Sequence, residues 1–216
     1  MNSSFIGILG LGVNSTVLLY KKLNNAFKEK YGEGHTCPIK LVNANFYPVN
    51  KHLPNELQQA GSHLKPYLDE LNEMQPSRVI IPNNTIHEVI DALGFEFSMP
   101  FGHIGKLINK FLSDNEEVTI LGTYHTMHSD YWNKFVPNHC TRRYVAKNLA
   151  LKLEKLRKIY IDGVDESLAK ECWSELLDSD HKNMIITCTE LSIAFQNFTS
   201  TRFTDTMDLQ VAFCLK

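Results

Sequence analysis

Two short stretches decide the fold: Ile6-Gly7-Ile8-Leu9-Gly10 near the start of the chain and Ile120-Leu121-Gly122 in its second half. Both are apolar runs that end in glycine, the pattern of a buried parallel strand followed by a loop. A second pair, Val79-Ile80-Ile81-Pro82-Asn83 and Met184-Ile185-Ile186-Thr187-Cys188, comes in the same order. Each second copy lies about a hundred residues after the first. One such match could arise by chance, but two in the same order predict two lobes of similar build.

Longer amphipathic stretches separate these runs, an alternation typical of βαβ units. We therefore predict an α/β protein with two pseudo-symmetric lobes, each a mainly parallel sheet flanked by helices. The lobes span residues 1–114 and 115–216, with the alternative that the final helix packs on the first lobe. Besides the runs quoted above, we expect strands at 38–42 and 118–121, helices at 15–30, 53–74, 85–93, 104–112 and 207–215, and further helices from about 126, between 143 and 157, and from about 190.

Composition narrows the class of protein without naming an activity. The 216 residues carry 22 Lys and Arg against 24 Asp and Glu, so a net charge of −2 gives no bulk attraction to nucleic acid. No stretch reaches the ~18 apolar residues of a membrane helix, and the first twelve residues lack the basic charge of a signal peptide. The five cysteines, an odd number with no closely spaced pair, favour free thiols in a reducing cytoplasm over a disulfide framework. We expect a folded cytoplasmic protein that binds neither nucleic acid nor membrane.

Ligands of parallel sheets bind outside the carboxyl ends of the strands. In this chain those ends carry four loops, at residues 10–14, 83–85, 122–126 and 188–190. We expect all four to face one cleft between the lobes, which would then hold the active site.

The last of these loops, Thr187-Cys188-Thr189-Glu190, holds a cysteine where a strand gives way to a helix. Backbone N–H groups and the helix dipole are expected to favour its thiolate. The alternative is a buried structural thiol, a common state for cysteine. At the matched place in the first half, Asn84 and Thr85 open a helix with polar donors that suit an anion, although ordinary helix capping explains them as well.

The remaining polar candidates are weaker. Gly122 to Thr126 offers hydroxyls and amides, which a plain turn would also explain. A dinucleotide site at Gly10-Leu11-Gly12 is disfavoured, because Ser15 stands at the third glycine position and the second strand lacks an acidic residue at its end. His87 and His103 lie nearest the predicted cleft, where we expect them to orient or pack. The spacing of the histidines indicates no metal site.

Five motifs in order resemble the cofactor-independent aspartate/glutamate racemase family over most of the chain. The opening strand, loop and helix match its glycine-rich start, and Thr187-Cys188-Thr189-Glu190 matches its second cysteine motif. The other similar segments are Ile81-Pro82-Asn83-Asn84-Thr85-Ile86-His87, Leu121-Gly122-Thr123-Tyr124-His125-Thr126 and Asp205-Thr206. The chain departs from the family at Asn83, where the first catalytic cysteine would stand. It resembles the branch that carries a non-cysteine polar residue there.

The resemblance implies an amino-acid racemase that uses no cofactor and no metal. Cys188 would act as acid and base, with Asn83 in place of the first cysteine. The residues implied to bind an amino acid or dicarboxylate are Leu11, Asn84, Thr85, Thr123, Thr126 and Thr189, with possible support from His87, His103 and Glu190. The basic residues that could grip a side-chain carboxylate are Lys51, Arg142, Arg143 and Lys147. A homodimer is suggested by analogy with the family.

Two alternatives stay open at this point. Asn83 cannot titrate near neutral pH, so a symmetric two-thiol mechanism is unavailable, and water or His87 would have to serve that face. The chain could instead be a catalytically impaired protein that binds amino acids or dicarboxylates. It could also be a single-cysteine decarboxylase or isomerase of the same superfamily, in which one thiol protonates an enediolate.

Overall fold

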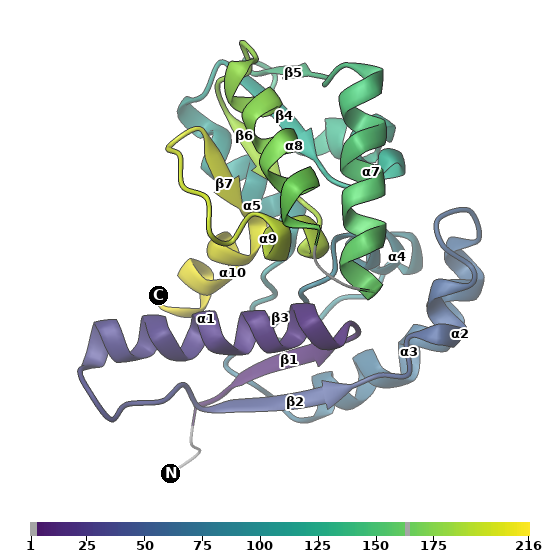
Figure 1. The fold of residues 1–216 in the computed structure, drawn as a ribbon. Helices are drawn as coiled ribbons and strands as arrows, with labels where there is room; N and C mark the ends of the chain where they lie inside the picture. Colours follow the sequence, from purple (N-terminus) through teal and green to yellow (C-terminus); the bar gives the residue numbers. More distant parts are fainter. Residues whose placement is uncertain (1–3, 163–164) are drawn as a thin grey trace. The chain divides into compact units, whose positions relative to one another are not determined.

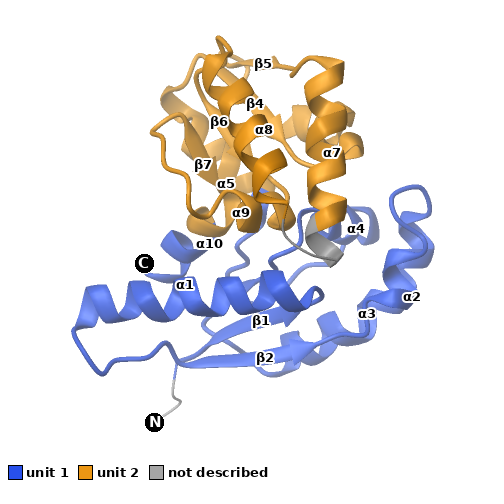
Figure 2. Ribbon diagram, viewed as in Figure 1, with its two compact units in different colours: residues 1–104, 210–216 blue, residues 105–209 orange. Residues whose placement is uncertain are grey.

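A computed structural model describes residues 4–162 and 165–216 of the chain. The chain divides into two compact units, coloured separately in Figure 2. Unit 1 comprises residues 1–104 and 210–216, and unit 2 comprises residues 105–209.

The sheet of unit 1 has three parallel strands in the order β2 (Ile39–Asn43), β1 (Ile6–Gly10) and β3 (Arg78–Ile80). In the register of this sheet, Ile8 of β1 lies between Leu41 and Ile80. Every residue of β1 is buried, as expected for the central strand of a parallel sheet covered on both faces. The carboxyl ends of β1 and β3 therefore lie side by side at one edge of the sheet.

Helices cover both faces of this sheet (Figure 1). The long helix α1 (Val13–Tyr31) lies on one face and buries Leu19 and Leu23. On the other face, α3 (Leu57–Glu73) and α4 (Asn84–Leu93) pack with Leu9 and Val79 in one apolar core. A short helix, α2 (Tyr47–Asn50), precedes α3.

The sheet of unit 2 has four parallel strands in the order β5 (Thr141–Arg143), β4 (Glu117–Leu121), β6 (Met184–Ile186) and β7 (Phe203–Asp205). Its central strands β4 and β6 repeat the β1–β3 pairing of unit 1. The helices of this unit are α5 (Ile104–Phe111), α6 (Tyr124–His128), α7 (Lys147–Asp162), α8 (Glu166–Asp178) and α9 (Thr189–Ala194). The 3-10 turns lie at Leu112–Asp114 and Asp130–Phe135.

The core of unit 2 forms where α7, α8 and α9 meet β4 and β6, and it is rich in aromatic rings. Trp173 of α8 stacks on Phe203 of β7 with ring centroids 4.1 Å apart. It also contacts Phe195 and Phe198, at 5.2 and 5.3 Å. Because aromatic side chains bury large apolar areas, this cluster fixes the segments that follow β6.

The predicted α/β architecture of two similar lobes is confirmed. The helix expected over 53–74 begins later, as α3 at Leu57, because Pro54 and its neighbours form turns between α2 and α3. The strands β5 and β7 and the helix α8 were not expected.

The units divide at 104/105 and 209/210, whereas we expected one boundary at 114/115. The ring of Phe135 packs so closely on Gly105 of α5 that a β-carbon there would lie 2.4 Å from it. Asn109 of the same helix donates a hydrogen bond to the carbonyl oxygen of Phe135 at 3.1 Å. These contacts assign nearly all of α5 to unit 2. The final helix, α10 (Thr206–Cys214), contributes its residues from Gln210 onward to unit 1.

Within the described ranges, the helices are all too short or too polar to cross a bilayer.

Candidate active site

The polar residues predicted for the site gather at the carboxyl ends of the central strands, in a separate group in each unit. In unit 1 they follow β3, and in unit 2 they follow β4 and β6. Asn83, Asn84, Thr85, His87 and His103 form the first group. Thr123, Thr126, Cys188, Thr189 and Glu190 form the second.

Asn83 is the N-cap of α4. Its side-chain oxygen Oδ1 accepts a hydrogen bond from the backbone N–H of Ile86 at 3.3 Å. Its own N–H donates to the carbonyl oxygen of Ile81 at 2.9 Å. The side chain that replaces the expected cysteine therefore begins a helix, and a carboxamide does not titrate near neutral pH.

Asn84 is a buried polar residue whose side chain makes no hydrogen bond to the described part of the chain. Its side chain is buried, with 6% of the residue exposed. Among the described residues neither its Oδ1 nor its Nδ2 atom has a hydrogen-bond partner, and the same is true of the buried Thr16 hydroxyl. Buried polar groups are normally satisfied, so these atoms are suited to a ligand that supplies both donors and acceptors. Thr85 next to Asn84 is half-buried, whereas the Leu11 side chain lies in the apolar core.

His87 and His103 are buried beneath this loop. The carbonyl oxygen of Ile81 can only accept, so Nε2 of His87 carries the proton that is donated to it at 3.1 Å. The other ring nitrogen, Nδ1, accepts from the N–H of Ile104 at 3.4 Å. Burial, reinforced by neighbouring His103, lowers the pKa of His87 to about 3. His87 is thus a neutral ring with both nitrogens occupied, which suits orientation rather than proton transfer.

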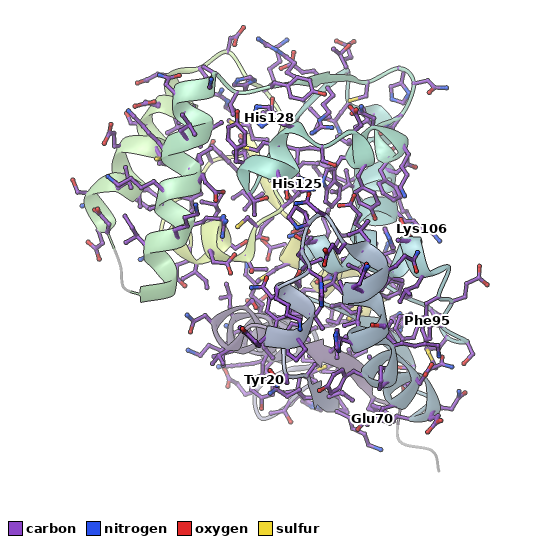
Figure 3. All side chains as sticks on the ribbon, turned by 90° about the vertical axis from the view of Figure 1, so that its right-hand side faces the viewer. Tyr20, Glu70, Phe95, Lys106, His125 and His128 are labelled. Carbon is purple, nitrogen blue, oxygen red and sulfur yellow. The ribbon has the colours of Figure 1, made fainter. Side chains whose placement is uncertain are left out.

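The Thr123 loop of unit 2 is held by its own hydroxyls. Thr123 caps α6, its Oγ1 accepting from the N–H of Thr126 at 3.0 Å, and the two hydroxyl oxygens lie 2.9 Å apart. One hydroxyl proton makes the bond between them, which leaves the other free for a ligand. Gly122 is required here, because a β-carbon would lie 2.8 Å from the Thr187 hydroxyl. Figure 3 labels His125 and His128, which belong to the helix that follows this loop.

Cys188 precedes α9 and is 4% exposed. Its thiol donates a hydrogen bond to Oε2 of Glu190 at 3.1 Å, and the Thr189 hydroxyl donates to the same oxygen at 3.3 Å. Burial, followed by the charge of Glu190, raises the pKa of the Cys188 thiol well above its ordinary value. The backbone N–H of Leu191 lowers this pKa, but by less. The expectation that the loop favours a thiolate is therefore wrong for this state, because burial and a carboxylate outweigh the amide.

The Asp205-Thr206 motif supports the end of the strand that precedes the Cys188 loop. The Thr206 hydroxyl donates to the carbonyl oxygen of Ile186 at 3.0 Å, and Asp205 accepts from the N–H of Met207 at 2.8 Å. The Thr206 bond ties the start of α10 to the end of β6, two residues before Cys188.

Two of the basic residues considered from the sequence are engaged in structural bonds. Arg142 donates to the carbonyl oxygens of Thr126, Met127 and Ser129 and to the Asn133 side chain, so it closes the end of α6. Arg143 pairs with Asp180 at 2.9 Å and with Glu117, the first residue of β4, which is the opposite edge of the sheet from the loops. Lys51 and Lys147 are exposed.

Sequence reasoning missed Arg157 of α7. This arginine interacts electrostatically with Cys188 and Glu190. Its Nε and Nη2 atoms contact the Glu154 carboxylate at 2.8 and 2.5 Å. The spacing of Glu154 and Arg157, three residues apart on a predicted helix, was the available signal for the ion pair.

Residues 4–162 and 165–216 contain no group of three or more His, Cys, Asp or Glu side chains that could hold a metal ion.

Comparisons with known proteins agree on one family. A family model described as Asp/Glu/Hydantoin racemase matches residues 8–214. A crystal structure of a candidate Asp/Glu racemase from Yersinia pestis has a TM-score of 0.80 and 18% identity, covering 99% of this chain and 100% of that one. The Picrophilus torridus aspartate racemase has a TM-score of 0.73 and 16% identity, covering 99% and 93%. A Francisella tularensis glutamate racemase in complex with D-glutamate has a TM-score of 0.58 and 16% identity, covering 100% and 80%.

Proposed function

The chain belongs to the Asp/Glu/Hydantoin racemase family, and on that premise we propose that it is an amino-acid racemase that exchanges the α-proton of its substrate without pyridoxal or another cofactor. The observation that carries the proposal is the hydrogen bond from the Cys188 thiol to Glu190 at 3.1 Å. A buried thiol beside a carboxylate has a partner that can accept its proton, which a merely structural cysteine does not need.

The proposed step begins with the protonated thiol. The S–H proton passes to Oε2 of Glu190, leaving a thiolate and a carboxylic acid. The thiolate removes the α-proton from the substrate, and the C–H electron pair becomes part of an enolate-like anion. That anion needs hydrogen-bond donors at its carboxylate, because charge develops there in the transition state. Return of a proton to the α-carbon, from either face, completes exchange or inversion.

The donors available for this task lie in the predicted loops. We propose that Asn84, Thr85, Thr123, Thr126 and Thr189 hold the carboxylate and the amino group, with the backbone of Leu11 as a further contact. The unpartnered amide of Asn84 supports this assignment, since a ligand carboxylate and ammonium would satisfy its donor and its acceptor respectively.

Asn83 makes the proposed chemistry asymmetric. A two-base racemase has a titratable group for each face of the α-carbon, whereas this chain offers one thiol and a carboxamide that caps a helix. His87 is a poor substitute, because both of its ring nitrogens are already bonded. We propose that water supplies the proton on the Asn83 face, so that one enantiomer is deprotonated much faster than the other.

Proton exchange in deuterated water tests the proposal. The purified protein is incubated with L- and D-aspartate and L- and D-glutamate, and loss of the α-proton signal is followed by NMR. We expect exchange that is faster for one enantiomer and absent in Cys188→Ala. Exchange that survives in Cys188→Ala, or its absence from the wild-type protein with all four substrates, would contradict the proposed activity.

A binding protein without turnover is the second candidate, and Asn83 is the observation that favours it. If the wild-type protein is stabilised thermally by amino acids or dicarboxylates but exchanges no proton, this candidate replaces the racemase. We further propose that the chain acts in the cytoplasm, because its five cysteines are free and buried, and that it forms a homodimer by analogy with its family. Light scattering of the purified protein tests the dimer.

A further inference from the structure

We propose that Glu154 and Arg157 of α7 form a positioning pair, which links the two loops of unit 2 and supplies the positive charge beside which Cys188 and Glu190 share a proton. The catalytic meaning of this inference rests on the proposed function. Its structural part concerns the thiol alone and can be tested without substrate.

Glu154 fixes one of the two loops. Its Oε2 atom accepts a hydrogen bond from the backbone N–H of Tyr124 at 2.9 Å. Tyr124 is the first residue of α6 and directly follows Thr123, so this carboxylate satisfies an amide that the helix itself leaves unpaired. Glu154 is therefore both a cap for the Thr123 loop and an anchor for Arg157.

Arg157 is linked to the other loop by its charge and by the packing of α7 on α9. The guanidinium binds both oxygens of Glu154, which restricts it to one orientation on the helix surface. Its side chain is 22% exposed and that of Glu154 is 16% exposed, so water screens the pair only weakly. The positive charge acts on Cys188 and on Glu190, and α7 packs on α9, the helix that begins beside that thiol.

The charges explain why the pair is needed. With two carboxylates and one guanidinium, the group of Glu154, Glu190 and Arg157 already carries one net negative charge. Lys158 also contacts Glu154, but its side chain is mostly exposed and water screens its charge. Losing the Cys188 proton to water would add a second negative charge in a buried place, which is unfavourable. Passing that proton from Sγ to Oε2 of Glu190 keeps the total unchanged. Arg157 then stabilises the negative charge on whichever of the two atoms carries it.

Alkylation of Cys188 measures this effect directly, because the thiolate is the reacting species. The full-length protein is treated with iodoacetamide from pH 6 to pH 10, and the peptide containing Cys188 is quantified by mass spectrometry. In Arg157→Gln we expect alkylation at a fixed pH to slow by about tenfold, the change that one pKa unit produces. Arg157→Lys, which keeps the charge, should recover most of the rate. Should the glutamine variant not fold, Arg157→Met preserves the apolar stem and makes the same comparison.

The direction of the change separates a positioning role from a merely structural one. Loosened packing would expose a thiol that is only 4% accessible and would therefore accelerate its alkylation. The matched control is Lys158→Gln, which removes another cation that contacts Glu154 at 3.3 Å but whose side chain is 65% exposed. We expect it to leave the alkylation rate unchanged. An unchanged or faster rate in Arg157→Gln would overturn the inference, whereas absence of proton exchange in the wild-type protein would overturn only the proposed function.

Discussion

The thiol of Cys188 donates a hydrogen bond to the Glu190 carboxylate across 3.1 Å. The two residues are separated by Thr189 alone, and the Thr189 hydroxyl donates to the same carboxylate oxygen. The carboxylate therefore holds the thiol in place while it opposes the loss of its proton to water. Glu190 has two opposite effects on reactivity, and a single substitution can separate them.

Replacing Glu190 with glutamine should lower the pKa of Cys188 and yet slow α-proton exchange. The nearby charge that raises this pKa is removed, so iodoacetamide should alkylate Cys188 roughly tenfold faster at a fixed pH. Exchange should fall by at least about tenfold, because the amide cannot accept the thiol proton. The two rates are measured on the same preparation, with Glu190→Asp as the control that keeps a carboxylate. If both rates rise together in the glutamine variant, Glu190 is not the proton acceptor.

Restoring a cysteine at position 83 should even out the two enantiomers. Asn83→Cys supplies a second titratable group, so exchange of the slower enantiomer should rise towards that of the faster one. The same change removes a helix cap and should cost about 1 kcal/mol of stability. Asn83→Ala is the matched control, since it loses the cap without gaining a thiol. If the slower enantiomer exchanges no faster in the cysteine variant than in the alanine variant, position 83 takes no part in proton transfer.

Much of the fold could be predicted because its central strands are apolar and continuous in sequence. The runs that end at Gly10 and Leu121 are short and mostly apolar, as buried parallel strands are, and both form inner strands of their sheets. The edge strand at Thr141–Arg143 lacked this signal, since two of its three residues are arginines that bond elsewhere. Its strand conformation comes from pairing with β4, a partner distant in sequence.

The loops of the site were also predictable, but the state of their side chains was not. Strand ends can be located from the sequence, which is why Asn84, Thr123 and Cys188 were singled out. Whether Cys188 is a thiol or a thiolate depends first on its burial, then on the charge of Glu190, and less on Arg157, which lies thirty-one positions earlier in the sequence. The local sequence pattern identifies the backbone amides that favour ionisation of Cys188, but it does not reveal the burial that opposes this ionisation.

Trp173→Ala should destabilise unit 2 without altering the residues that carry the chemistry. The ring stacks on Phe203 and contacts Phe195 and Phe198, so its removal leaves a large apolar cavity. We expect a loss of about 3–5 kcal/mol in the free energy of unfolding, measured by urea denaturation. Trp173→Phe should lose less because it fills part of the space. A loss below about 1 kcal/mol for the alanine variant would mean that the cluster does not support this core.

His87 should make the protein less stable in acid. Its pKa is about 3 in the folded protein against 6.5 for the free side chain, so the unfolded chain binds the proton more readily between these values. The contribution of His87 to stability is therefore complete above pH 6.5 and falls as the pH drops towards 3, by at most roughly 5 kcal/mol.

In His87→Phe, urea denaturation at pH 7 should show a cost of about 1–3 kcal/mol, because the N–H of Ile104 loses its acceptor. Between pH 7 and pH 4.5 the variant should lose less stability than the wild-type protein. The exposed His139 offers a control, since His139→Gln should keep the wild-type acid dependence. Parallel losses in the wild-type protein and His87→Phe would show that this buried histidine does not set the acid sensitivity.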